Sequence, residues 1–278
     1  MALRSAGAET GLRSAAMDLE REYSPSSRVG GSAEPFVADY VARSAAARAQ
    51  VPPRSLKGGH LLAEATPGAP LLVYVHGGYW QALSAADSWY LAPGAVAAGW
   101  SFAAVEYTLA PAVTIEQMVV QVAAGVAGAA AELRPSAVVL AGHSAGAHLA
   151  AMVALVAPAR AAVDRLVLIS GVYDLRPLVH TTVNDALGLD EGAAAELSPA
   201  LLPLVDHRPH TVVVWGDNDT DAFRAQGAAF ARRCGADAFE CPGRHHFDIV
   251  DDLVDPATRL GAVSLAARTT APGRSAPG

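Results

Sequence analysis

The stretch that most constrains the fold is AVVLAGHSAGAHLAAMVAL, residues 137–155. Its first five residues are apolar and predict a buried strand, and the run of Ala, Leu and Met after Gly146 predicts a helix. Between them lies the pattern Gly-x-Ser-x-Gly, which arises by chance in a chain rich in Gly, Ala and Ser. A strand, a sharp turn and a helix in this order, however, hold the central serine exposed above a sheet. The context therefore predicts that Ser144 is a nucleophile.

The rest of the chain alternates short apolar runs with longer stretches of helical character. Strands are expected at 71–75, 102–106, 137–141, 165–170, 211–215 and 236–240. Helices are expected at about 34–49, 84–99, 114–133, 145–157, 221–233 and 246–254. Several strands are apolar on both faces, which is typical of a sheet covered by helices on both sides. The alternation predicts an α/β fold with a mostly parallel sheet and right-handed crossovers.

The chain has 278 residues, 52% of them hydrophobic, which is enough for one large domain with its own core. We expect this domain to cover 17–265, since no internal linker divides it. Residues 1–16 and 266–278 are small, polar and rich in Gly or Pro, so we expect disordered extensions there. Residues 171–210 break the alternation and are too long for a plain connection. They predict a small helical insertion that covers the site.

Charge and cysteine usage exclude several classes of partner. The net charge is −7 and no Lys/Arg stripe is present, which argues against binding nucleic acid. No apolar run reaches the roughly 18 residues of a membrane span, and the N-terminus lacks the apolar core of a secretory signal. Cys234 and Cys241 fit neither a disulfide framework nor a metal site, which favours reduced thiols in the cytoplasm. We expect a small-molecule substrate and no metal; whether the chain forms a homodimer stays open.

A serine hydroxyl needs a base to take its proton. In a strand–serine–helix arrangement of this kind, an acid and then a histidine follow the serine along the chain. His207 and His210 precede the strand at 211–215 and therefore any acid that follows it. The segment PGRHHFDIVDDL then leaves two neighbours, and we expect His246 to be the base, with His245 as the alternative.

The acid should follow the strand at 211–215, where the sequence reads VVVWGDNDTDAF. Asp217, Asp219 and Asp221 are available there. One of them can instead cap the helix that starts near Thr220. We expect Asp219 to accept the histidine proton, with Asp217 as the second choice.

The strand at 71–75 ends in His76-Gly77-Gly78, followed by two large aromatic residues. Attack on a carbonyl places negative charge on its oxygen, which backbone N–H groups must stabilise. We expect the donors to be Gly77, Gly78 and Ala145, because a side chain at either glycine would occupy the oxyanion's place. His76 is expected to orient this loop.

These segments together resemble a known family. HGGYW (76–80) and GHSAG (142–146) resemble the α/β-hydrolase superfamily near the hormone-sensitive-lipase branch, and EYTLAP (106–111) is similar to that branch's DYRLAP. More narrowly, the spelling HGGYW resembles the kynurenine formamidases. The further similar segments are EREYSPSSRV (20–29), SGVYDLRPLVHTTVNDALGL (170–189), GDNDTDAFRAQGAAF (216–230) and HHFDIVDDL (245–253). The resemblance covers about 20–255 and implies the triad Ser144, Asp219 and His246.

The resemblance implies hydrolysis of N-formyl-L-kynurenine to kynurenine and formate through a formyl-serine, with no metal or organic cofactor. Tyr79 and Trp80 are expected to line the pocket mouth and stack on the substrate ring, although packing against a helix is an equal alternative. Further candidates for substrate contacts are Tyr23, Ser24, His143, Tyr173, His180 and Asn184. Each of these is also explained by ordinary packing or hydrogen bonding.

Three other functions share parts of this pattern. A carboxylesterase acting on short-chain or aryl esters would carry the same serine, triad and oxyanion loop. An arylformamidase or amidase acting on a modified kynurenine in specialised metabolism is equally compatible with the motifs. A non-catalytic pseudo-hydrolase would have lost a triad member, and none is lost here.

Overall fold

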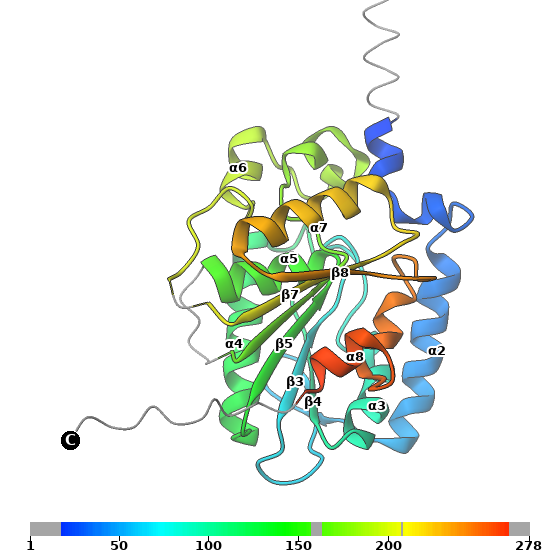
Figure 1. Cartoon of the computed structure of the whole chain (residues 1–278), viewed down its shortest axis with the longest axis vertical. Coiled ribbons are helices and arrows are strands. Elements are labelled where there is room, and N and C mark those ends of the chain that lie inside the picture. The colour runs from blue at the N-terminus through cyan, green and yellow to red at the C-terminus, as the bar shows by residue number, and fades with distance from the viewer. Residues whose placement is uncertain (1–17, 157–162, 207, 267–278) are drawn as a thin grey trace, which may run out of the picture.

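A computed structural model of the chain describes residues 18–156, 163–206 and 208–266. The expected extensions at 1–16 and 266–278 lie outside the described residues, apart from residue 266. The centre is an eight-stranded sheet of order β1-β2-β4-β3-β5-β6-β7-β8 (Figure 1). The strands are β1 (Arg54–Ser55), β2 (Leu61–Ala63), β3 (Leu71–Val75), β4 (Ser101–Val105), β5 (Val138–His143), β6 (Arg165–Ile169), β7 (His210–Gly216) and β8 (Asp237–Cys241).

The strands from β4 to β8 in this order are parallel. At one edge, β2 pairs antiparallel with both β4 and β1. All six predicted strands are present, with ends that differ by at most two residues. The two edge strands are too short, at two and three residues, to show a repeating pattern in the sequence.

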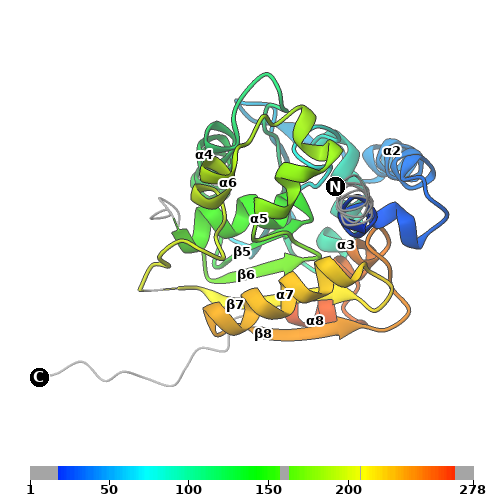
Figure 2. The same cartoon turned by 90° about the horizontal axis from the view of Figure 1, so that it is seen from above.

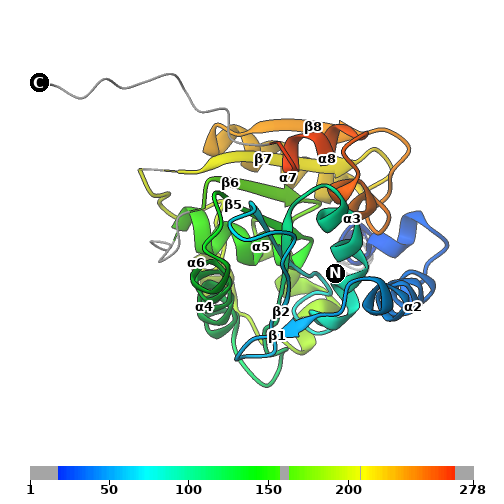
Figure 3. The same cartoon turned by 90° about the horizontal axis from the view of Figure 1, so that it is seen from below.

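Each face of the sheet is covered by helices (Figure 2, Figure 3). Successive residues of a strand point to opposite faces. Val73 and Val75 therefore join the core under α4 (Ile115–Leu133), α5 (Ala145–Ala151) and α7 (Asp221–Cys234). Leu72 and Tyr74 join a second core with α3 (Ala92–Ala97) and α8 (Arg259–Ser264), beside α2 (Glu34–Gln50). Two buried faces explain why β3 is an uninterrupted apolar run.

Three predicted helices differ from the expectation. The stretch at 84–99 divides into a 3₁₀ helix η2 (Ala86–Leu91) and α3, whose first turn holds Pro93, where a missing N–H costs nothing. The stretch at 246–254 is only the 3₁₀ helix η6 (Ile249–Val254). Helix α5 continues as a π-helical turn over Met152–Val156. Among the described helices, none is long and apolar enough to cross a membrane.

The predicted insertion after β6 is present as three short helical pieces. They are the 3₁₀ helices η4 (Arg176–His180) and η5 (Thr182–Asp185) and the helix α6 (Glu191–Glu196). Leu178 and Ala194 are fully buried and join the core that contains α5. The insertion is therefore packed onto the domain beside the carboxyl end of β5.

The first described segment is fastened over the same end of the sheet. Residues 18–22 are helical and lead into the 3₁₀ helix η1 (Pro25–Arg28). Thr220 Oγ1 donates a hydrogen bond to the carbonyl of Glu22 at 2.6 Å. Thr182 in the insertion donates to the carboxylate of Glu20. The N-terminal segment thus connects α7 to the insertion.

Candidate active site

Ser144 occupies the sharp turn between β5 and α5. Its φ of 55° and ψ of −121° are unusual for a residue other than glycine, and such a backbone costs about 1–3 kcal/mol. Close backbone contacts require glycine on both sides of the serine. A Cβ at position 142 would lie 2.2 Å from the carbonyl oxygen of Gly146. A Cβ at position 146 would lie 2.1 Å from the carbonyl oxygen of Val75. The turn holds the serine at the wall of a cavity.

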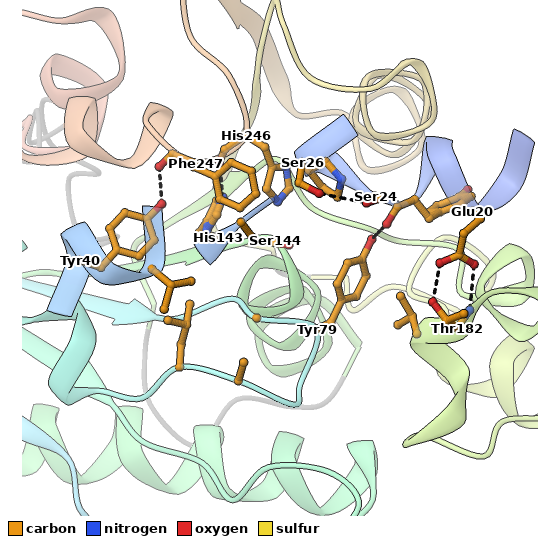
Figure 4. Close-up of a pocket in the computed structure, with 18 residues that line it drawn as sticks. Glu20, Ser24, Ser26, Tyr40, Tyr79, His143, Ser144, Thr182, His246 and Phe247 are labelled. Atoms are coloured by element: carbon orange, nitrogen blue, oxygen red, sulfur yellow. Dashed lines mark hydrogen bonds between the residues drawn. The ribbon is translucent and has the colours of Figure 1, made fainter. Parts of the chain in front are cut away.

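His246 and Asp219 form a buried pair next to this serine. Nδ1 of His246 lies 3.1 Å and 3.2 Å from the two carboxylate oxygens of Asp219. Asp219 follows the end of β7 and His246 follows β8, so neighbouring parallel strands deliver both side chains to one edge. Figure 4 shows His246 beside Ser144 at the cavity. This arrangement leaves Nε2 of His246 as the ring nitrogen that can take a proton.

The charges at the site follow from burial and from this pair. Burial opposes the ionisation of Asp219, but attraction to His246 and their hydrogen bond outweigh it, so its pKa lies below the ordinary value. Burial, and then repulsion from His246, lower the pKa of His143 to about 3. His143 is therefore neutral at pH 7, and its Nε2–H donates to the carbonyl of His246 at 2.8 Å. This bond holds the backbone of the loop that carries His246.

The alternative residues lie in other contacts. The carboxylate of Asp217 accepts a hydrogen bond from the N–H of Gly243 at 2.9 Å. Nδ1 of His245 accepts one from the N–H of Phe247 at 3.1 Å. The structure thus brings Asp219, rather than Asp217, to His246.

The glycine loop after β3 is oriented by Tyr107, a residue that sequence reasoning did not select. Its hydroxyl donates to the carbonyls of His76 and Gly77, at 3.0 Å and 3.2 Å. In a trans peptide the C=O and N–H point in opposite directions. The N–H groups of Gly77 and Gly78 are therefore turned away from Tyr107. An added Cβ at Gly77 would lie 3.0 Å from Cβ of Ser144, so the loop touches the serine.

The third expected donor, the N–H of Ala145, lies at the start of α5. The first N–H groups of a helix have no acceptor within the helix, and the first residue here is Ala145. His76 does not line the cavity; its ring stacks on Tyr107 at 4.2 Å and its Nε2 lies 3.5 Å from Glu106. The contacts of His76 with Tyr107 and Glu106 thus hold the loop in place.

The cavity has a volume of about 330 Å³, within the range of small-molecule sites. Eighteen residues line it, drawn in Figure 4. The lining residues that the sequence predicts for the site are Tyr23, Ser24, Gly78, Tyr79, His143, Ser144 and His246. The hydroxyl of Tyr79 donates to the carbonyl of Tyr23 at 2.5 Å.

Trp80 and Tyr173 do not line the cavity. Both side chains pack in the core instead. Trp80 is fully buried, with its ring edge-on to His148 at 5.2 Å. Tyr79 and Trp80 have φ values of 50° and 60°, so the chain reverses here and turns the indole into the core. Tyr173 is equally buried and stacks on Phe230 at 4.2 Å.

His180 and Asn184 also lie outside the cavity lining. His180 pairs with Glu191 at 2.9 Å on the surface. The side chain of Asn184 bonds to both the N–H and the carbonyl of Leu189, which closes a turn of the insertion. Their neighbours Thr182 and Val183 reach the cavity instead.

Other lining residues were missed because they come from distant segments. Glu20 and Ser26 come from the N-terminal segment, and Tyr40 from α2. Tyr40 donates to the carbonyl of Phe247, beside the catalytic candidates. The resemblance at 20–29 was a signal for the first two, but no pattern in the sequence joins these segments to Ser144.

In the ranges of the chain that the structure describes, no three His, Cys, Asp or Glu side chains gather as metal ligands. Cys234 and Cys241 are buried free thiols. The groups at the cavity suited to chemistry are the serine and the His246–Asp219 pair.

Comparison with known proteins matches residues 72–242 to a family described by the alpha/beta hydrolase fold. The chain belongs to the alpha/beta hydrolase fold family. In such hydrolases the nucleophile, acid and histidine follow one another along the chain, with an oxyanion loop after an early strand. The order Ser144, Asp219, His246 and the loop at Gly77 and Gly78 fit this hydrolase pattern.

Curated relatives of this hydrolase include two from fish. A protein named kynurenine formamidase from Salmo salar is 35% identical over 201 residues, which cover 67% of this chain and 68% of the relative. One of the same name from Danio rerio is 34% identical over 215 residues, which cover 70% and 72%.

Solved structures also resemble this hydrolase. A putative thioesterase from Silicibacter sp. TM1040 superposes with a TM-score of 0.80 at 31% identity, covering 89% of this chain and 99% of the other. A hyperthermophilic esterase from Pyrobaculum calidifontis gives a TM-score of 0.66 at 20% identity, covering 84% and 88%. The second likeness speaks for the fold alone.

Proposed function

We propose that this hydrolase cleaves the formamide of N-formyl-L-kynurenine to kynurenine and formate. The observation that carries the proposal is the buried His246–Asp219 pair beside Ser144, which lines the cavity. The names of the curated relatives supply the substrate. The formyl carbon is small enough to reach a serine held in a narrow turn, and the aryl group would lie in the cavity.

The first step is attack by Oγ of Ser144 on the formyl carbon, while Nε2 of His246 takes the hydroxyl proton. Asp219 holds Nδ1–H and stabilises the imidazolium that forms. The carbonyl oxygen becomes an oxyanion, which accepts hydrogen bonds from the N–H groups of Gly77, Gly78 and Ala145.

The tetrahedral intermediate then breaks its carbon–nitrogen bond. His246 returns its proton to the departing arylamine nitrogen, so kynurenine leaves and a formyl ester remains on Ser144. Water, deprotonated by His246, attacks this ester. Formic acid leaves and ionises in water to formate, and the proton on His246 restores the serine hydroxyl.

The test is kcat/KM of the purified protein on N-formyl-L-kynurenine beside p-nitrophenyl acetate. We expect a clear preference for the formamide, and loss of both activities in Ser144→Ala. Efficient ester cleavage with little turnover of the formamide would instead assign a carboxylesterase with the same triad.

We also propose a reducing, cytoplasmic setting. Cys234 and Cys241 are free and buried, as expected for thiols that need no oxidising compartment. Cell fractionation with an antibody to the protein tests this, and recovery from a secreted fraction would contradict it.

A further inference from the structure

The cavity wall contains one carboxylate. Among the described residues that line it, Glu20 is the only acidic or basic side chain apart from the two histidines. The remaining polar lining consists of hydroxyl groups, with apolar residues such as Val37 and Phe247 around them. A single fixed charge in a mostly apolar cavity favours a ligand with the opposite charge at that place.

Glu20 is held in a defined orientation by the insertion. Its Oε2 accepts a hydrogen bond from the N–H of Thr182 at 2.9 Å, and its Oε1 accepts one from the Thr182 hydroxyl. A carboxylate has about four acceptor positions, so these bonds leave further positions free.

No cation balances this carboxylate in the part of the chain that the structure describes. The neighbouring Arg21 pairs with Glu22, at 3.6 Å. The negative charge of Glu20 is therefore available to a bound molecule.

The position of Glu20 along the cavity matters as much as its charge. Figure 4 shows Glu20 and Thr182 on one side of Tyr79, with Ser144 and His143 on the other. A molecule that presents its reacting carbonyl to Ser144 can thus extend past the Tyr79 ring and reach Glu20 with its far end.

We propose that Glu20 binds the α-ammonium group of the substrate's amino-acid head, an assignment that rests on the function proposed above. In N-formyl-L-kynurenine the formamide and the amino-acid chain leave neighbouring positions of one ring. The formamide at Ser144 and the ring beside Tyr79 place the ammonium end toward Glu20. The contact is a charge-assisted hydrogen bond, the stronger kind in proteins.

The experiment removes each partner of this contact separately. The protein variant is Glu20→Gln, which keeps an acceptor oxygen for Thr182 but loses the charge. The substrate variant is 3-(2-formamidobenzoyl)propanoate, which keeps the formamide, ring and carboxylate but lacks the ammonium. The control is Glu22→Gln, with the same charge change in the same segment; Glu22 accepts from the N–H of Ala222 at 3.1 Å and does not line the cavity.

We expect Glu20→Gln to lower kcat/KM on N-formyl-L-kynurenine by about ten- to a hundredfold. The same variant should act on the ammonium-free substrate at close to the wild-type rate, which also shows that it is folded. Glu22→Gln should leave both rates near wild type.

Equal losses on both substrates would overturn the proposal, because Glu20 would then only hold the insertion. A wild-type enzyme that uses both substrates equally well would overturn it too. A wild-type enzyme that cleaves esters but neither formamide would instead refute the proposed function, and the assignment of Glu20 with it.

Discussion

The Tyr107 hydroxyl should control turnover without touching the substrate. It is buried and donates to the carbonyls of His76 and Gly77, at 3.0 Å and 3.2 Å, which turns the N–H groups of Gly77 and Gly78 away from Tyr107. Tyr107→Phe removes this donor and little else. We therefore expect kcat to fall while KM changes little, because the oxyanion exists only after attack.

The size of the effect follows from which carbonyl loses its partner. Nδ1 of His76 also lies 3.0 Å from the oxygen of Gly77, so Gly77 keeps one contact and only the carbonyl of His76 is left unpaired. An unpaired buried group costs about 1–2 kcal/mol, which is about five- to thirtyfold in an equilibrium. Removing an oxyanion donor outright costs about a hundred- to a thousandfold in kcat, which sets the upper limit.

The assay is steady-state kinetics on N-formyl-L-kynurenine and p-nitrophenyl acetate, with Tm measured alongside. Both substrates form an oxyanion at the same loop, so kcat should fall similarly on both. Tyr173→Phe is the matched control, since Tyr173 is also buried but its hydroxyl makes no hydrogen bond to the glycine loop. An unchanged kcat, or a change confined to KM, would refute the role assigned to Tyr107.

Three other predictions follow from the same contacts. Asp219→Asn should lower kcat by a factor on the order of 10⁴, while Asp217→Asn stays near wild type; the reverse order would move the acid to Asp217. Gly146→Ala should lower the free energy of unfolding, measured in urea, by about 3 kcal/mol or more. The new Cβ would lie 2.1 Å from the carbonyl oxygen of Val75. Wild-type stability in this variant would show that the turn can relax. The pKa of His143 is about 3 when folded and 6.5 in its ordinary state, so between these values the unfolded chain binds the extra proton. The free energy of unfolding should fall by up to about 1.4 kcal/mol per pH unit as pH drops through this window, and His143→Gln should reduce the slope; an unchanged slope in that variant would exclude His143 as its cause.

The parallel strands were predictable because burial on both faces leaves an apolar run that no surface element shows. β3 (Leu71–Val75) matches its predicted range for this reason. β1 and β2 were missed because an edge pair of two and three residues is defined by its partner strand.

The turn at Ser144 and the positions of Asp219 and His246 could be predicted because each follows a strand. The choice between His245 and His246 could not, since adjacent residues differ only in where a turn directs them. Trp80 shows the same limit, because two successive positive φ values direct its ring into the core. Glu20 lies 162 positions from Thr182 along the chain, so only the folded structure brings them together.

The measurement that most directly tests the central claim is mass spectrometry of rapidly quenched mixtures of enzyme and N-formyl-L-kynurenine. The account predicts a transient mass increase of one formyl group on the peptide that contains Ser144, with no increase in Ser144→Ala. A formyl group on another residue, or turnover retained in Ser144→Ala, would contradict it.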